Sequence, residues 1–295
     1  GNGFLGKMLL KELEDKEIKT KVIYRSSISK ELKRFSNISF LKKDLSKNEI
    51  KEEEISDIET VIHLAGKTKN SDSNNENLFK DNELSTFYLT NLLIKNKNIK
   101  KFIFASTQYV YGNPCRFNID EDSLLAPDFC SYSKSKCNAE NHIRHLQKVN
   151  NIECISLRFS GFIDGGGLID YLIKKALLNE EICLYSNGKI MRDYLPSSKA
   201  IESILQVLNK KFEKNFTAIN IGSGQRISSL VIAQIIINEL NSISKIKLLE
   251  KNSALGNFVF KIEKAKKILD FDPGNLSLFI KEYTKTFKIN SNKKI

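Results

Sequence analysis

The chain has 295 residues, of which 41% are hydrophobic and 9% aromatic, and it contains 47 lysines and arginines and 35 acidic residues. This composition is typical of a globular protein with a sizeable core, and no apolar run reaches the roughly 18–20 residues that span a membrane. The net charge of +12 can indicate nucleic-acid binding, but the lysines are scattered, without an arginine-rich block or interleaved aromatic residues. We therefore expect no nucleic acid and no membrane as partners, and an anionic small-molecule substrate accounts for part of the charge.

Cysteine and histidine usage argues against disulfides and metal sites. The five cysteines are odd in number and form no C-x-x-C pair, so we expect reduced thiols and a cytoplasmic protein. His142 and His145 lie three residues apart, but no third ligand is evident, and we expect no metal site.

Short apolar or β-branched runs alternate with longer helical patterns over about the first 160 residues. The helical patterns cover residues 78–94 and 132–149, and the strand-like runs are residues 21–24, 38–41, 60–64, 102–105 and 154–157. Such runs are typical of buried parallel strands. Their alternation with helices predicts an α/β fold with a Rossmann-like doubly wound parallel sheet, and we expect a first domain over residues 1–160.

The rhythm is less regular from about Gly161 onward. Short strands are expected at residues 183–185 and 218–220, between helices at residues 201–208, 228–240 and 263–269. This mixture indicates a smaller C-terminal α/β lobe over residues 161–295, interleaved with the first domain. A ligand would lie at the carboxyl edge of the sheet.

The chain opens with a glycine-rich sequence that fits a phosphate-binding turn. Gly3 and Gly6 match the last two glycines of G-x-x-G-x-x-G, where the backbone approaches a pyrophosphate and a helix start supplies N–H groups. The matching first glycine would precede residue 1, and no strand-like run precedes the turn. We therefore expect a fragment of a longer protein, in which the first and central strand of the sheet is missing.

Tyr132 and Lys136 are one helical turn apart, so their side chains can face the same pocket. A strand-like run upstream ends in Ser106 and Thr107, which adds a hydroxyl group. A Tyr–Lys pair alone more often lies on a solvated helix face. The order of glycine turn, hydroxyl-ended strand and Tyr–Lys helix favours a functional pair that moves a proton to or from a sugar oxygen while a cofactor moves a hydride.

Taken together, these motifs resemble the extended short-chain dehydrogenase/reductase family, also called the NAD-dependent epimerase/dehydratase family. Residues 106–112 resemble its S-[ST]-x-x-V-Y-G motif, and the resemblance extends from Gly3 to about Pro273. It implies a nucleotide-sugar oxidoreductase or isomerase of polysaccharide biosynthesis, with an NAD(P)-binding first domain and a nucleotide-sugar-binding second lobe. The apolar positions on residues 78–94 also suggest a homodimer of the kind family members form.

The same resemblance implies which residues bind the cofactor. Arg25 follows the second strand, where NAD-preferring members usually carry an acid, so NADP is favoured slightly over NAD, unless Arg25 only stacks on adenine. Asp44 and Leu45 resemble the pair near the adenine. The implied cofactor-binding residues are Gly3, Phe4, Leu5, Gly6, Arg25, Asp44, Leu45, Leu64, Ala65, Gly66, Asn82, Tyr132 and Lys136.

Residues 187–194 resemble G-x-x-x-R-D-[FY], whose arginine contacts the diphosphate in nucleotide-sugar members, and this places Arg192 at that position. Residues 220–224 resemble the family's N-[IV]-G-[ST]-G turn. Residues 158–164 lack the usual N-x-Y-G-P pattern, so the identity of the sugar stays open. The implied substrate-binding residues are Thr107, Gln108, Tyr109, Ser160 and Arg192.

For the chemistry, we expect Tyr132 to be the acid/base, with Lys136 and the nicotinamide charge lowering its pKa from the usual ~10. Thr107 would hold the reacting sugar oxygen. Family 4,6-dehydratases carry an Asp-Glu pair where this chain has Gln108 and Tyr109, which disfavours dehydration. A 4-ketoreductase and a 4-epimerase remain equally open, and the alternative class is a non-catalytic NADP-binding sensor.

Overall fold

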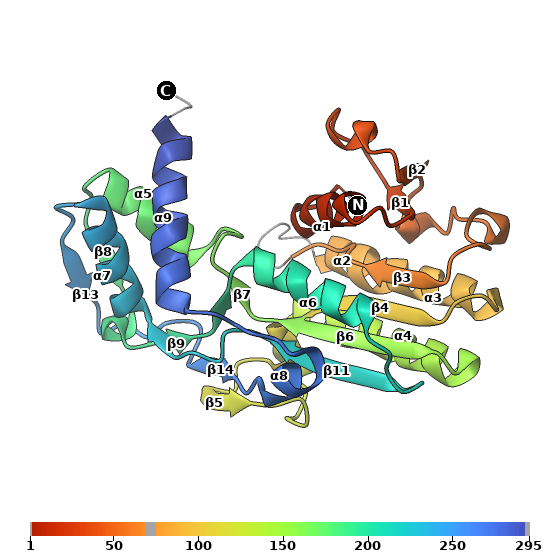
Figure 1. Ribbon diagram of the computed structural model, residues 1–295. Coiled ribbons are helices and arrows are strands. Elements are labelled where there is room, and N and C mark those ends of the chain that lie inside the picture. Colours follow the sequence, from red (N-terminus) through yellow and green to blue (C-terminus); the bar gives the residue numbers. More distant parts are fainter. Residues whose placement is uncertain (1, 69–74, 293–295) are drawn as a thin grey trace. The chain divides into compact units, whose positions relative to one another are not determined.

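The structure is a computed structural model that describes residues 2–68 and 75–292. The chain divides into two compact units (Figure 1). The first unit comprises Gly1–Gly112, Leu124–Arg158 and Ile201–Ile219, and the second comprises Asn113–Ser123, Phe159–Ala200 and Asn220–Ile295. The chain first enters the second unit at Asn113, returns to the first at Leu124 and enters the second again at Phe159. A single boundary at residue 160 does not separate the two units. The first unit also contains residues 201–219, and the second also contains residues 113–123.

Parallel strands form the framework of the first unit. Its strands are β1 (Thr20–Tyr24), β2 (Ile38–Lys42), β3 (Thr60–His63), β4 (Lys101–Thr107), β6 (Glu153–Phe159) and β11 (Phe216–Ile221). They are arranged as a β1–β2 pair and a sheet of order β11–β6–β4–β3. β1 pairs with β2 in parallel, and β3 pairs with β4 in parallel. Five of these strands coincide with the five strand-like runs of the sequence, and the predicted α/β fold is confirmed.

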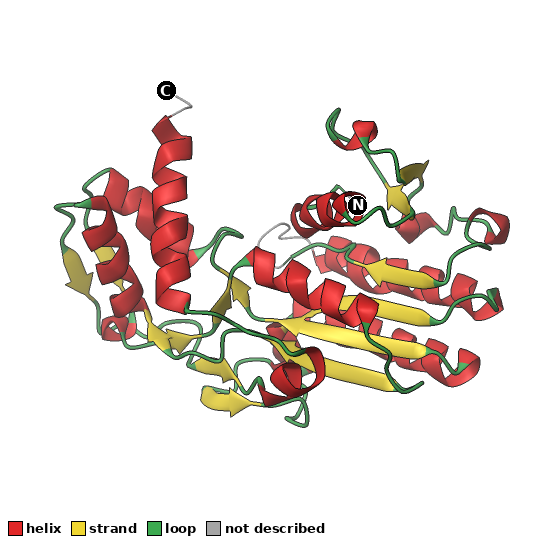
Figure 2. Cartoon of the chain, in the orientation of Figure 1, coloured by secondary structure: helices red, strands yellow, loops and turns green. Residues whose placement is uncertain are grey.

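Helices flank these strands (Figure 2). The helices of this part of the chain are α1 (Phe4–Asp15), α2 (Asn75–Leu78), α3 (Ser85–Lys95), α4 (Ser131–Asn150) and α6 (Ser197–Asn209). In Figure 1, α6 lies in front of the larger sheet, and α3 and α4 lie behind it. A π-helical turn at Phe79–Leu84 joins α2 to α3, and such turns are frequent at functional sites.

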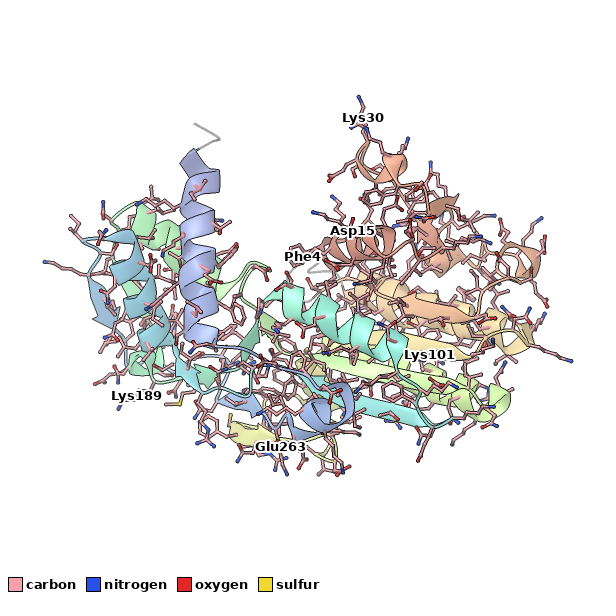
Figure 3. All side chains as sticks on the ribbon, in the orientation of Figure 1. Phe4, Asp15, Lys30, Lys101, Lys189 and Glu263 are labelled. Carbon is pink, nitrogen blue, oxygen red and sulfur yellow. The ribbon has the colours of Figure 1, made fainter. Side chains whose placement is uncertain are left out.

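The core of the first unit explains the position of α4. Phe102 and Phe104 of β4 are fully buried and pack in one cluster with Ile143 and Leu146 of α4. This fixes the face of α4 that carries Tyr132, because residues at helical spacing share a face. At the other end of β4, the Lys101 ammonium donates to the carbonyl oxygens of Val207, Leu208 and Lys210 at the end of α6 (Figure 3).

The second unit has small sheets and a helical core. Its strands are β5 (Arg116–Ile119), β7 (Gly161–Phe162), β8 (Ile182–Leu184), β9 (Met191–Arg192), β10 (Tyr194–Leu195), β12 (Ile227–Ser228), β13 (Ile246–Leu248) and β14 (Phe258–Phe260). Its helices are α5 (Leu168–Leu177), α7 (Ser229–Leu240), α8 (Glu263–Leu269) and α9 (Leu276–Asn292). The strand orders are β12–β9–β14–β5, β10–β7 and β13–β8. Leu172 of α5, Ile236 of α7 and Ile280 of α9 are fully buried in one apolar cluster.

Two elements that the sequence placed in the smaller lobe belong mainly to the first unit. The strand expected at residues 218–220 is part of β11, which pairs with β6 in the larger sheet. The helix expected at residues 201–208 lies in α6, and residues 201–209 belong to the first unit. Separately, no helix within residues 2–68 and 75–292 is long and apolar enough to cross a membrane.

Candidate active site

The start of α1 has the features of a phosphate-binding turn. Gly3 is the N-cap residue and contributes no capping side chain, and the first turn of the helix contains no acidic residue. A Cβ on residue 3 would meet no atom within 4 Å, so the approach to the helix start is open. The first N–H groups of a helix lack intrahelical partners and point at an incoming anion. The start of α1, where Figure 3 labels Phe4, therefore has the chemistry of an anion site, and pyrophosphate binding by Gly3–Gly6 stays a prediction.

Arg25, one residue after β1, is held by an acidic partner. Its Nη1 lies 2.8 Å from Asp81 Oδ1, and the hydrogen bond with Asp81 raises the pKa of Arg25. The side chain of Arg25 is nevertheless 54% exposed, which leaves much of the guanidinium open to a ligand. Asp44 Oδ1 accepts hydrogen bonds from the N–H and hydroxyl of Ser46. Burial would raise the pKa of Asp44, but the bonds from Ser46 lower it overall. Leu45 packs against the core.

The loop after β3 approaches the π-helical turn closely. Gly66 has a φ of +155°, and a Cβ there would lie 2.5 Å from Asn82 Oδ1. Asn82 Oδ1 accepts from the N–H of Lys67 at 2.8 Å, and its Nδ2 donates to Lys67 O and to Ser135 Oγ, each at 3.1 Å. Asn82 therefore ties the loop of Leu64, Ala65 and Gly66 to α4 at the residue before Lys136. Only glycine fits at position 66.

The three predicted catalytic residues lie together in the first unit. Thr107 ends β4, and Tyr132 and Lys136 lie in the first two turns of α4; all three are buried. The Thr107 hydroxyl lies close enough to the Tyr132 phenol to lower the pKa of Tyr132. The Lys136 ammonium donates to the carbonyl oxygen of Ala105 at 2.9 Å and lies 4.6 Å from the centre of the Phe104 ring. This constellation places a phenol, a hydroxyl and an ammonium at the carboxyl end of a parallel strand.

The pKa of Tyr132 is set mainly by burial. Burial raises it to about 12, and the nearby Thr107 hydroxyl offsets this only in part. Burial also lowers the pKa of Lys136 to about 8, and the negative charge of Glu140 offsets this lowering only in part. For the protein without its cofactor, the pKa of Tyr132 is therefore raised, because desolvation outweighs the lowering effect of Thr107. The expected lowering by Lys136 together with the nicotinamide charge stays a prediction. At neutral pH Tyr132 holds its proton.

His63 at the end of β3 is neutral. Burial lowers its pKa to about 3. The Thr86 hydroxyl donates to Asn82 O at 2.6 Å, so its oxygen accepts from His63 Nε2 at 2.9 Å. The imidazole therefore supports the helix that carries Asn82 and has no role in moving protons at neutral pH.

A buried network behind the catalytic residues was missed by sequence reasoning. Glu140, one turn after Lys136, accepts from Ser106 at 2.7 Å, from Ser156 at 2.8 Å and from Arg158 at 3.0 and 2.7 Å. Burial would lower the pKa of Arg158, but Glu140 raises it overall. The network ties α4 to β4 and β6. The spacing of one helical turn from Lys136 to Glu140 could have indicated the carboxylate of this network. Its partner Arg158 appeared in the sequence only as the first residue of the segment 158–164, which lacks the N-x-Y-G-P pattern.

Gln108 and Tyr109 follow Thr107 and face different surroundings. Gln108 is buried, and its Oε1 has no hydrogen-bond partner among the residues that the structure describes. Tyr109 packs edge-on against the Tyr132 ring, with centroids 5.8 Å apart and an interplanar angle of 71°. Tyr109 therefore packs against Tyr132, and Gln108 contributes an amide. Neither side chain is a carboxylic acid that could serve as a second proton donor next to Thr107.

The remaining two predicted substrate residues lie in the second unit. Ser160 is buried, its N–H donates to Ile221 O at 2.9 Å, and its hydroxyl has no partner among the residues described. Arg192 Nη1 donates to Gly256 O at 3.0 Å, and its guanidinium lies 5.3 Å from the centre of the Phe258 ring. The neighbouring Asp193 accepts from Ser223, Gly224 and Phe260. These bonds organise the turn at residues 220–224 that the sequence singled out.

Metal ligation and disulfides have no support in the described part of the chain. No group of three or more His, Cys, Asp and Glu side chains within it could hold a metal ion. All five cysteines are free, and burial raises the pKa of Cys137 and of Cys154 to about 12.

Comparison with known proteins is consistent with this geometry. The model of the "NAD dependent epimerase/dehydratase family" matches residues 1–222. A dTDP-D-glucose 4,6-dehydratase of Dictyostelium discoideum is 31% identical over 81% of this chain and 60% of its own. A dTDP-4-dehydro-6-deoxyglucose reductase of Escherichia coli is 30% identical over 82% of this chain and 80% of its own.

A solved structure extends the likeness to the whole fold. The UDP-glucuronic acid 4-epimerase of Bacillus cereus, in complex with UDP-glucuronic acid and NAD, superposes with a TM-score of 0.82. It is 22% identical and covers 97% of both chains. These three proteins carry out three different reactions, so similarity alone does not select one. The matched family model and the 30% identical reductase show that this chain belongs to the NAD dependent epimerase/dehydratase family.

Proposed function

We propose that this protein transfers a hydride between NAD(P) and a carbon of a nucleotide sugar, most simply C4, with Tyr132 as the acid/base. The observation that carries the proposal is the burial of Thr107, Tyr132 and Lys136 together, in a unit that also contains a glycine-capped helix start. NAD(P), when bound, supplies the acceptor or donor of the hydride. The chain's own residues bind, orient and move the proton.

Tyr132 would exchange its phenolic proton with the reacting sugar oxygen. Its pKa of about 12 keeps it protonated at neutral pH, which is the form that donates when a keto sugar is reduced. Thr107, whose hydroxyl lies near the Tyr132 phenol, would hold the same sugar oxygen in line. In the oxidising direction, the positive charge of Lys136 and of an oxidised nicotinamide would favour the phenolate.

Lys136 would bind the nicotinamide ribose while its carbonyl partner keeps it in place. Its ammonium already donates to Ala105 O, and a Cβ on residue 66 would lie 3.4 Å from its Nζ. Glycine at position 66 therefore keeps open the space between Lys136 and the loop after β3. Arg192 of the second unit would bind the diphosphate of the substrate through its planar guanidinium.

Two reactions fit this constellation, and dehydration fits it less well. Elimination of water needs an additional acid and base next to Thr107, and Gln108 and Tyr109 cannot fill both roles. The protonated state of Tyr132 and the exposed Arg25 guanidinium favour 4-ketoreduction with NADPH. The resemblance to solved 4-epimerases keeps 4-epimerisation as the second candidate.

The proposed cofactor preference is for NADP. Arg25 is 54% exposed beside Ser26 and Ser27, and hydroxyl groups next to a guanidinium suit a 2′-phosphate. Asp81 neutralises part of its charge, so we expect a preference and not exclusion of NAD. We also propose a homodimer through α3, where a hollow of about 300 Å³ is lined by Phe87, Tyr88 and Leu92.

A substrate panel tests the function. UDP-, dTDP-, CDP- and GDP-sugars, including 4-keto-6-deoxy forms, are incubated with the protein and NADPH, and in parallel with the protein and NAD+ or NADP+. Absorbance and product NMR are followed in both series. Stoichiometric loss of NADPH identifies a ketoreductase, and sugar conversion without net cofactor change identifies an epimerase. If the protein binds the cofactor but catalyses neither reaction with any sugar of the panel, the proposal is contradicted. A non-catalytic NADP-binding sensor is then supported.

A further inference from the structure

The carboxylate of Asp193 is fully buried in the second unit and joins three of its segments. Asp193 lies between β9 and β10, and its own N–H donates to Phe258 O at 2.9 Å. Its Oδ1 accepts from the N–H of Ser223 at 2.7 Å and from the Ser223 hydroxyl at 2.8 Å. Its Oδ2 accepts from the N–H of Phe260 at 3.1 Å and from that of Gly224 at 3.2 Å. The turn after β11 and strand β14 are therefore both bound to one carboxylate.

This set of donors fits the ionised form of Asp193. An ionised carboxylate accepts at both oxygens, whereas the neutral acid carries a proton on one of them, which would face an N–H group. A Cβ on residue 222 would lie 2.6 Å from Asp193 Oδ2, so the turn packs directly against the carboxylate. Protonation therefore weakens at least one bond from a buried N–H, that of Ser223 or that of Phe260.

Strand β14 is also the strand against which Arg192 rests. Phe258 is the register partner of Arg192, and the guanidinium lies 5.3 Å from the centre of the Phe258 ring. Arg192 Nη1 donates to the carbonyl oxygen of Gly256 at 3.0 Å, just before this strand. Asp193 is bonded to the same strand at Phe258 and at Phe260. The carboxylate therefore fixes the surface on which the neighbouring guanidinium lies.

We propose that Asp193 is a positioning residue, whose ionised carboxylate holds Arg192 in the geometry that binds the diphosphate of a nucleotide sugar. This role rests on the proposed binding of the diphosphate by Arg192, and it adds a residue that controls the affinity without touching the substrate. A planar guanidinium binds phosphate oxygens through two parallel hydrogen bonds, so a small shift of the group costs affinity. Release of β14 from Asp193 permits such a shift.

The ionisation of Asp193 changes in mildly acidic solution. Burial raises its pKa to about 6, and the hydrogen bonds from Ser223, Phe260 and Gly224 offset this only in part. The affinity for a nucleotide sugar should therefore be highest above pH 7 and should fall below pH 6, because the neutral acid no longer holds β14. Arg192 keeps its charge throughout this range, since a guanidinium loses its proton only above pH ~12.

Asp193 has no ionic partner among the residues described, since its hydrogen bonds all come from uncharged donors. The titratable side chains on the segments packed against it, and on β5 beside β14, are Arg116, Glu121, Arg192, Tyr194, Arg226 and Lys261. Arg116, Arg226 and Lys261 are exposed. Glu121 accepts from the N–H of Asn220. Burial and hydrogen bonds therefore set this pKa.

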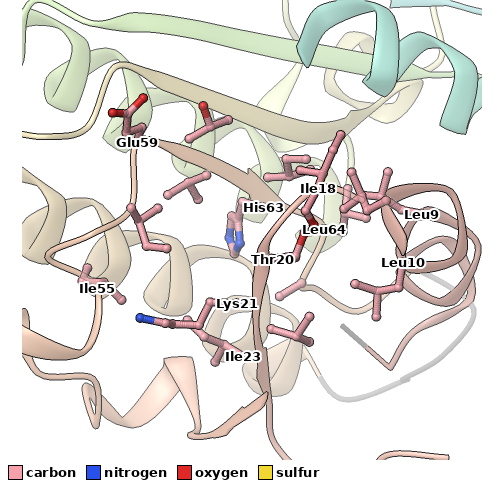
Figure 4. A pocket seen from close by; sticks show the side chains of 18 of the residues that line it. Leu9, Leu10, Ile18, Thr20, Lys21, Ile23, Ile55, Glu59, His63 and Leu64 are labelled. Carbon is pink, nitrogen blue, oxygen red and sulfur yellow. Dashed lines mark hydrogen bonds between the residues drawn. The ribbon is translucent and has the colours of Figure 1, made fainter. Parts of the chain in front are cut away.

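The three histidines of the chain lie in the first unit. His63 lines a cavity there, as Figure 4 shows, and its pKa of about 3 keeps it neutral above pH 5. His142 and His145 lie on α4. A pH dependence that arises from these residues would be shared by every variant of Asp193, so a comparison of variants isolates the effect of the carboxylate.

The test measures the binding of a nucleotide sugar to the full chain at different pH values. UDP-, dTDP-, CDP- and GDP-glucose are titrated by calorimetry at pH 7.5 without added cofactor, and the one that binds most tightly is followed down to pH 5. These ligands lack the terminal phosphate that titrates near pH ~6, because both of their phosphates are esterified on two sides. The dissociation constant of the wild type should rise roughly tenfold from pH 7.5 to pH 5, because only about one molecule in ten keeps Asp193 ionised at pH 5.

Three variants separate positioning from general stability. Asp193→Asn keeps the size of the side chain but places an amide NH2 against the donors, so it should bind roughly tenfold more weakly at pH 7.5 and with little pH dependence. Ser223→Ala removes one donor that lowers the pKa of Asp193, so the fall in affinity should begin at a higher pH. The matched control is Asp170→Asn, because Asp170 is a carboxylate of the same unit that accepts from the Tyr283 hydroxyl. It should keep the affinity and pH profile of the wild type, and NADPH affinity should be unchanged in all three variants.

Equal pH profiles of the wild type and Asp193→Asn would overturn the proposal, as would an unshifted profile of Ser223→Ala. If Asp193→Asn does not fold, the profiles of the wild type and Ser223→Ala decide. Binding that is unaffected by pH and by these substitutions contradicts the role of Asp193 alone. If no nucleotide sugar binds to the wild type at pH 7.5, the proposed function is contradicted, and the role of Asp193 falls with it.

Discussion

Arg158 of β6 and Glu140 of α4 form a buried ion pair, with Arg158 Nη2 2.7 Å from Glu140 Oε2 and both side chains at most 2% exposed. The pair binds the helix of Tyr132 and Lys136 to the sheet that carries Thr107, through Ser106 on the neighbouring position of β4. The relative placement of phenol, ammonium and hydroxyl therefore depends on a charge pair that contacts none of the three directly.

Replacing Glu140 by glutamine should destabilise the protein by about 3–5 kcal/mol, because it leaves Arg158 buried without its counter-charge. Urea unfolding measures the change. The matched control is the double variant Glu140→Leu with Arg158→Met, which replaces both charges by apolar groups and should recover most of the loss. A double variant as unstable as Glu140→Gln would contradict this account of the pair.

The lowered pKa of Lys136 predicts a specific pH dependence of stability. Between pH 8 and 10.5, an unfolded chain keeps the Lys136 proton that the folded chain has released, since the folded pKa is about 8 and the usual value is 10.5. The free energy of unfolding should therefore rise with pH through this window by up to about 3 kcal/mol from this group.

The variant Lys136→Met removes that contribution while keeping an unbranched side chain. The difference in unfolding free energy between the two proteins should change between pH 8 and pH 10, with the wild type gaining stability relative to the variant. A difference that stays constant over this range would show that the pKa of Lys136 is not lowered by burial.

Replacing Gly66 by alanine should weaken cofactor binding. The new Cβ would lie 2.5 Å from Asn82 Oδ1, and a φ of +155° is strained for any residue with a side chain. We expect the dissociation constant for NADPH, measured by fluorescence, to rise by roughly tenfold or more. Gly166→Ala is the control, because Gly166 also has a positive φ but open space around it. Equal losses of affinity in both variants would contradict a local effect at Gly66.

Replacing Arg25 by alanine should reduce the affinity for NADP by roughly tenfold and leave the affinity for NAD nearly unchanged, because only NADP carries a 2′-phosphate. Isothermal titration with both cofactors measures the ratio. An equal reduction for the two cofactors would indicate that Arg25 stacks on adenine and does not select the phosphate.

The sequence predicted those parts of the site that depend on local pattern. The apolar run of β4, the helical spacing of Tyr132 and Lys136 and the glycines before α1 are each visible within a few residues. Their order along the chain was enough to predict the sheet and to bring Thr107 next to Tyr132, because parallel strands deliver their carboxyl ends to one edge.

The parts that sequence reasoning missed depend on contacts between distant segments. β11 pairs with β6 although the second unit intervenes between them in the chain, so its place in the larger sheet is not visible from its own residues. The direction of the Tyr132 pKa shift depends on burial, which packing of Tyr109 and the sheet determines. Arg158 lies 18 residues from Glu140 on a different element, so only the fold reveals their pairing.

The most direct test of the central claim compares the wild type with Tyr132→Phe on a sugar that the wild type converts. Hydride transfer is followed as single-turnover change in NADPH absorbance, and cofactor binding is titrated in parallel. The account predicts a rate lower by roughly 10²–10⁴-fold with unchanged NADPH affinity, because only the phenolic proton is removed. A variant that turns over within a few fold of the wild type would contradict the assignment of Tyr132 as the acid/base.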